Sequence, residues 1–239
     1  MSYIDESQAK GLVKRIFRSL HAAAQNSAPQ SLEYSQRKIC KKIKRMCKEK
    51  SNAVFIAERF INTNKWQLIW GEWCLFNAKK QLFAINDIEQ YDQIAFDLTI
   101  NVKGGFSFKS FYVVLSKHAL VRLIMRSQQQ LKNPHDLNLY LKKITKTLVF
   151  SALELSDQYT KSNGEINQNC TVVEDVFLPL AIDIGINSQG LIAKTCTIKT
   201  FMPTHYDGAV AELSRKNPIL SKPNFFDYAD NFGILSSYN

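Results

Sequence analysis

The chain is short of the residues and motifs that mark most enzyme classes. It holds nine glycines in 239 residues, so phosphate-cradling loops are scarce, and neither a Walker loop nor a Rossmann glycine fingerprint is present. The Gly-x-Ser-x-Gly nucleophile elbow is also missing. The four histidines are remote from one another, without an HxxxH or HExxH pair, and this argues against a metal site. The sequence therefore predicts no cofactor and no metal.

Cysteines and long apolar segments are scarce as well. The five cysteines are an odd number, are scattered and form no CxxC pair, so we expect reduced thiols in a cytoplasmic protein. No apolar run approaches the ~20 residues of a membrane-spanning helix, and the first ten residues lack the apolar region of a signal peptide. We expect no membrane partner.

The composition is that of a globular protein with an excess of positive charge. Hydrophobic residues make up 45% of the chain and charged residues 22%, which excludes a disordered or collagen-like chain. The net charge is +10, and residues 1–50 carry twelve Lys or Arg against four Asp or Glu. Most of the excess therefore lies at the N-terminus, and an anionic partner is the leading hypothesis.

The N-terminal region is predicted to form two helices. Apolar residues at helical spacing, among them Leu12, Ile16 and Leu20, predict a helix over residues 5–25, and a second helix follows over 32–50. Cations cover most of the second helix: Arg37, Lys38, Lys41, Lys42, Lys44, Arg45 and Lys48. They are either the solvated face of a surface helix or a face that binds phosphates. We expect residues 1–50 to form a basic helical appendage to an α+β domain of residues 51–239.

The rest of the chain alternates between strands and helices. Strands are predicted over 53–60, 66–76, 93–103 and 106–115, and a hairpin over 170–184 and 190–202. Helices are predicted from Ser116 to about residue 130 and from Pro134 to about residue 159. These elements predict an α+β fold with a mostly antiparallel sheet and two central helices on one face. Of the three tryptophans, at least one should lie outside the main core. The alternatives for these rings are a base-stacking platform and core or interface packing.

One helix combines polar and apolar residues in a suggestive pattern. His118, Arg122 and Arg126 follow each other at four-residue spacing and form a single cationic stripe on a helix that is otherwise apolar. Histidine is the commonest general acid or base, and arginine fits phosphate oxygens. The stripe is either a site for an anionic substrate or the solvent-exposed side of a helix that is otherwise buried.

The motif formed by Ser116, His118, Ala119, Arg122 and Arg126 resembles the helix motif of small toxin proteins related to BrnT and RelE, in the barnase/RelE-like ribonuclease superfamily. Residues 197–201 are similar, more loosely, to the closing strand of such families. In that superfamily two helices precede a twisted antiparallel sheet. Those domains are about half as long as this chain, and their polar helix comes early, whereas more than a hundred residues precede it here.

The resemblance implies metal-independent RNA cleavage. His118 would then act as base or acid, Arg122 and Arg126 would stabilise the phosphorane charge, and Thr200 would bond a phosphate oxygen. His205 would be a second group for proton transfer, and its alternative is an exposed loop histidine.

Three classes of function follow. The first is a toxin-type ribonuclease. The second is a non-catalytic nucleic-acid-binding or regulatory module that uses the basic helix, with RNA favoured over DNA. The third is a protein-interaction or accessory protein. A neutralising or regulatory protein partner fits the first two. The ribonuclease requires His118 in a cleft beside Arg122 and Arg126, whereas the accessory protein should show a large apolar patch.

Overall fold

A curled, mostly antiparallel sheet organises the chain in the computed structural model. The structure describes residues 4–25, 36–62, 65–77, 82–83, 88–102, 105–107, 111–126, 131–173, 176–186, 192–207 and 209–210. The helices are α1 (Glu6–Gln25), α2 (Gln36–Glu49), α3 (Lys117–Arg126) and α4 (Pro134–Lys161), with a short 3-10 helix η1 (Ile88–Gln90). The strands are β1 (Ala53–Asn62), β2 (Lys65–Asn77), β3 (Leu82–Phe83), β4 (Gln93–Val102), β5 (Gly105–Ser107), β6 (Phe111–Ser116), β7 (Gln168–Val173), β8 (Val176–Ile186), β9 (Ile192–Ile198) and β10 (Met202–Pro203).

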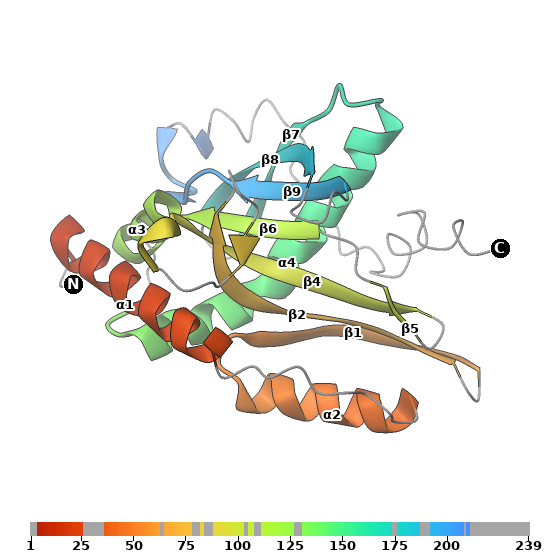
Figure 1. Cartoon of the computed structure of the whole chain (residues 1–239). Coiled ribbons are helices and arrows are strands. Elements are labelled where there is room, and N and C mark those ends of the chain that lie inside the picture. The colour runs from red at the N-terminus through yellow and green to blue at the C-terminus, as the bar shows by residue number, and fades with distance from the viewer. Residues whose placement is uncertain are drawn as a thin grey trace.

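The strand order of the sheet is β1-β2-β4-β6-β9-β8-β10, with β3 beside β2, β5 beside β4 and β7 beside β8. The pair β6 and β9 is parallel, and the other described pairs are antiparallel. α3 and α4 follow β6 in the chain, and Figure 1 shows α4 crossing behind the central strands. The predicted α+β fold, with two central helices packed on one face of the sheet, is confirmed.

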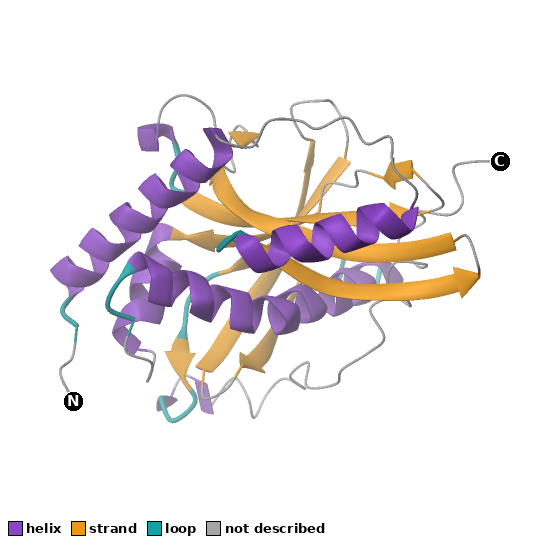
Figure 2. Ribbon diagram, turned by 90° about the horizontal axis from the view of Figure 1, so that it is seen from below, coloured by secondary structure: helices purple, strands orange, loops and turns teal. Residues whose placement is uncertain are grey.

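Alternation along the strands divides the sheet into two packed faces. In β2, Ile69 and Trp73 point into the main core with α1, α3 and α4, whereas Leu68 and Trp70 point to the opposite face, where α2 lies. Figure 2 shows α2 running along the first two strands on that side. α1, α3 and α4 thus pack on one face, and α2 covers the part of the other face formed by β1 and β2.

Trp70 and Trp73 are used for packing. Trp73 is fully buried, and its Nε1 donates a hydrogen bond to Thr145 Oγ1 on α4 at 2.9 Å. Trp70 is half-buried in the small cluster beneath α2. The side chain of Trp66 lies outside the described part of the chain. Neither Trp70 nor Trp73 therefore offers an open stacking platform.

The two N-terminal helices are attached differently. The apolar side of α1, including Leu12, Ile16 and Phe17, belongs to the main core. α2 instead forms a separate cluster with β1 and β2 through Cys40, Ile43 and Cys47. α1 is therefore part of the main body, and the expected boundary at residue 50 stays a prediction.

Local sequence signals set several of the element ends. The Ser116 hydroxyl accepts the Ala119 N–H at 3.0 Å at the start of α3, and the Asn133 side chain accepts the Asp136 N–H at 3.0 Å at the start of α4. Residues 127–130, where α3 was expected to continue, and nearly all of the tail after residue 207 lie outside the described residues.

One predicted strand boundary is wrong. Residues 170–184 were expected to form a single strand of a two-stranded hairpin, but they contain the end of β7 and most of β8, which pair with each other. β9 then pairs with β8, so the region is a three-stranded unit.

Among the described helices, none is long and apolar enough to span a membrane.

Candidate nucleic-acid interface

The basic helix α2 is amphipathic, with its cations directed away from the sheet. Cys40, Ile43 and Cys47 are buried against β1 and β2. Lys38, Lys41, Arg45 and Lys48 are exposed and follow each other at spacings of three, four and three residues. On a helix these spacings place all four on one side, opposite the buried side. We call these four residues the α2 stripe.

Lys44 and Arg45 of α2 are paired with acidic side chains. Lys44 Nζ pairs with Glu58 Oε1 on β1 and lies 5.2 Å from the centre of the Phe55 ring. Burial raises the pKa of the Glu58 carboxyl, but its bonds to Lys44 and to the Cys40 thiol outweigh burial and hold that pKa below its ordinary value. Arg45 Nε pairs with Glu49 Oε1 at 2.7 Å on the open surface, where such a pair stabilises little.

The remaining cations of the stripe face solvent. Within the described ranges, Lys38, Lys41 and Lys48 have no acidic partner. Lys42 is exposed as well, and Arg37 lies in α2 with its side chain outside the described part. From Lys38 to Lys48 the stripe extends about 15 Å along the helix, about the axial length of four nucleotides of one strand of a duplex. The stripe is thus an exposed row of positive charges about three helical turns long.

The cationic residues His118, Arg122 and Arg126, which we call the α3 stripe, have different contacts. His118 is exposed and Arg122 is half-buried, and both lie near Glu6 at the start of α1. Lys10 chiefly lowers the pKa of the Glu6 carboxyl through a hydrogen bond and its charge, and the charges of Arg122 and His118 add to the effect. His118 and Arg122 therefore share one surface with the N-terminal end of α1.

Arg126 belongs to a different contact. Its Nη1 donates to the Phe201 carbonyl oxygen at 2.9 Å, and its guanidinium carbon lies 5.4 Å from the centre of the Tyr206 ring. Burial lowers the pKa of Arg126, and the positive charge of Arg122 lowers it further. Arg126 thus fastens the segment after β9 to the end of α3.

Thr200 and His205 lie on the segment that Arg126 contacts, next to Phe201 and Tyr206 respectively. Thr200 is half-buried and precedes Phe201, and the exposed His205 ring packs edge-on against Tyr206 at 5.2 Å between centroids. His118 lies eight residues before Arg126, about 12 Å along the axis of α3. His118 therefore lies at one end of α3 and the segment with His205 is bound at the other, with Arg122 between them. A general acid and a general base must both reach one phosphate.

Sequence reasoning missed a second row of cations. Lys10, Lys14 and Arg18 are exposed on α1 at four-residue spacing, and this spacing could have identified them. The tertiary fold brings these three residues near Lys117 on α3, and no local sequence pattern predicts that proximity.

It also missed a pair of acidic side chains on neighbouring strands. Glu72 on β2 and Asp97 on β4 are directly paired in register, and Glu72 bonds Lys50 Nζ at 3.0 Å. Burial, reinforced by the negative charge of Glu72, raises the pKa of Asp97 to about 6. In the described part of the chain, no group of three or more His, Cys, Asp or Glu is arranged to hold a metal ion.

The fold and this surface together define an α+β protein with a cationic helix mounted on the outer face of its sheet. Comparison of the chain with protein-family models, with curated proteins and with solved structures finds no match. The resemblance of residues 112–126 to the toxin ribonucleases rests on those residues and stays a prediction.

Proposed function

We propose that this protein binds nucleic acid, with RNA the preferred partner, through the α2 stripe, and that it does so without catalysis. The observation that carries the proposal is the placement of Lys38, Lys41, Arg45 and Lys48 on one exposed side of a helix whose other side is anchored to the sheet. A fixed row of cations releases condensed counterions when phosphates replace them, and this release supplies affinity independent of sequence. The preference for RNA follows the resemblance described above.

Neutralising the stripe tests the proposal. In the triple variant Lys38→Gln, Lys41→Gln, Lys48→Gln, the line of log K against log salt should become shallower by about 2 for a single strand and by nearly 3 for a duplex, because three phosphate contacts are lost. The measurement is fluorescence anisotropy of a labelled RNA across a salt series. Glutamine keeps the helical propensity close to that of lysine, so α2 should stay folded.

A matched triple controls for net charge. Lys132, Lys146 and Lys199 are exposed and lie outside α2, and their replacement by glutamine removes the same charge. We expect the slope of this control to stay near that of the unmodified protein. Equal slopes for both triples would remove α2 from the binding surface.

One observation favours a second function, metal-independent RNA cleavage at His118 and Arg122. His118 is exposed, and the charges of both residues act on the same carboxylate, Glu6. Incubation of RNA with the protein and a chelator, beside the variants His118→Ala and Arg122→Ala, decides between the two functions. Cleavage that survives the chelator and is lost in both folded variants supports the ribonuclease, whereas intact RNA with a salt-sensitive complex supports binding alone.

A cytoplasmic location and a neutralising protein partner stay predictions. None of the five cysteines forms a disulfide in the structure.

A further inference from the structure

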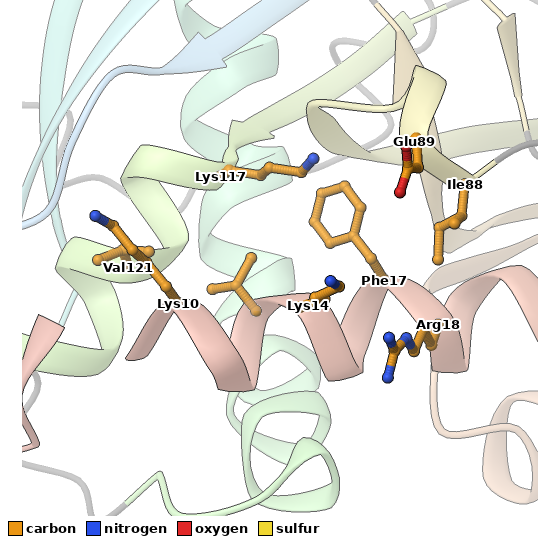
Figure 3. Close-up of a pocket in the computed structure, with 9 residues that line it drawn as sticks. Lys10, Lys14, Phe17, Arg18, Ile88, Glu89, Lys117 and Val121 are labelled. Atoms are coloured by element: carbon orange, nitrogen blue, oxygen red, sulfur yellow. The ribbon is translucent and has the colours of Figure 1, made fainter. Parts of the chain in front are cut away.

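We propose that a pocket between α1, η1 and the start of α3 binds a nucleoside phosphate. The pocket has a volume of about 440 Å³, within the range of small-molecule sites. Figure 3 shows its lining. The residues that line it are Lys10, Val13, Lys14, Phe17, Arg18, Ile88, Glu89, Lys117 and Val121. None of them belongs to α2, so the proposal is independent of nucleic-acid binding by the α2 stripe.

The positive charge of the lining residues favours an anionic ligand. Four lining residues are cations, and Glu89 is the one carboxylate among them. Lys10 is paired with Glu6 at 2.8 Å, but within the ranges that the structure describes Lys14 and Arg18 have no acidic partner. A row of ammonium and guanidinium groups at successive turns of one helix is suited to phosphate oxygens.

The apolar part of the lining is narrow, because its members are almost fully buried, and we infer that a ring lies against it beside the alkyl chains of Lys10 and Lys14. Val13, Phe17 and Val121 are buried members of the main core that also line the pocket. Lys117 lies over the Phe17 ring, with its Nζ 5.0 Å from the centroid, and Figure 3 shows it reaching from α3 toward that ring. Lys117 thus contacts an aromatic ring rather than an acidic side chain. It can therefore bind a phosphate without the loss of an ion pair.

The two parts together fit a nucleoside phosphate. Its phosphate would lie on Lys14, Arg18 and Lys117, and its base would lie against the apolar side. The ligand is either a free nucleotide or the phosphorylated end of a nucleic acid, because both present the same groups.

Calorimetric titration with AMP tests this pocket in the full chain, with adenosine as the uncharged comparison. We expect AMP to bind and adenosine to bind at least tenfold more weakly. Lys14→Glu should weaken AMP binding by about tenfold or more, because one charged contact is replaced by repulsion. Arg15→Glu is the matched control, since Arg15 is the exposed neighbour on α1 that does not line the pocket, and we expect less than a threefold effect.

Oligoribonucleotides with a 5′-phosphate or a 5′-hydroxyl distinguish the two sources. They are tested as competitors of AMP on the triple variant Lys38→Gln, Lys41→Gln, Lys48→Gln, in which the α2 stripe is weakened. Displacement by the phosphorylated oligonucleotide alone assigns the pocket to nucleic-acid ends, and displacement by neither assigns it to free nucleotides. The proposal is overturned if AMP does not bind at millimolar concentration, if adenosine binds equally well, or if Arg15→Glu is as damaging as Lys14→Glu.

Discussion

Gly71→Ala is expected to destabilise the protein by about 3 kcal/mol or more. Gly71 lies in β2 opposite Leu98 of β4. A Cβ atom at this position would be 2.3 Å from the Asp97 carbonyl oxygen and 2.7 Å from the Phe96 ring. The carbonyl belongs to the backbone of the paired strand, so the methyl group can be accommodated only if β2 and β4 move apart. Urea denaturation of the purified variant measures the loss.

Gly11→Ala provides the matched control. Gly11 is exposed on α1, and a Cβ atom added there meets nothing within 4 Å. Alanine should therefore stabilise the helix by about 0.5–1 kcal/mol, since glycine loses more conformational freedom on folding. A Gly71→Ala protein as stable as the unmodified one would contradict the close approach of β2 and β4 at this point.

Asp97→Asn is expected to stabilise the protein above pH 7 by about 2–3 kcal/mol and to have little effect near pH 4. The pKa of Asp97 is raised from 3.8 to about 6, chiefly by burial and further by Glu72. Between these two values the folded state keeps a proton that the unfolded state has released, so stability falls as the pH rises through this window. Above this window Asp97 is charged in both states, and the folded state carries the cost of holding that charge partly out of water and beside Glu72.

The difference in the free energy of unfolding between the Asp97→Asn variant and the unmodified protein should therefore grow from pH 4 to pH 7. Thermal or urea unfolding measures it. Asp183→Asn controls for the loss of one negative charge, because Asp183 is exposed on β8, and we expect it to show a much smaller pH-dependent difference. A difference for Asp97→Asn that stays constant with pH would contradict the raised pKa.

Local patterns in the sequence predict much of this fold. The periodicity of Leu12, Ile16 and Leu20 placed α1 correctly, and Ser116 and Asn133 marked the starts of two helices. Pairings between distant strands carry no such signal. The parallel pair of β6 and β9 joins Tyr112 to Thr195, and only the complete fold brings these residues together. The boundary between β7 and β8 was missed because only Glu174 and Asp175 separate the two apolar runs, with no glycine, asparagine or proline to mark a turn.

The candidate site shows the same limit. The charge pattern of α2 indicates a cationic helix, but the pairing of Lys44 with Glu58 depends on how α2 docks on β1. The α3 stripe looked continuous because helical spacing describes one helix alone, whereas Arg126 is bound to the Phe201 carbonyl, 75 residues further along the chain. The pocket was not predicted at all, since Lys117 lies about a hundred residues from Lys14.

The most direct test of the central claim is to map where RNA contacts the protein. The full chain is cross-linked to a uniform RNA at moderate salt, and the modified peptides are identified by mass spectrometry. Binding through the α2 stripe predicts that cross-links concentrate in peptides covering residues 38–48 and decrease as salt is raised. Cross-links that are confined to other segments and do not change with salt would contradict it.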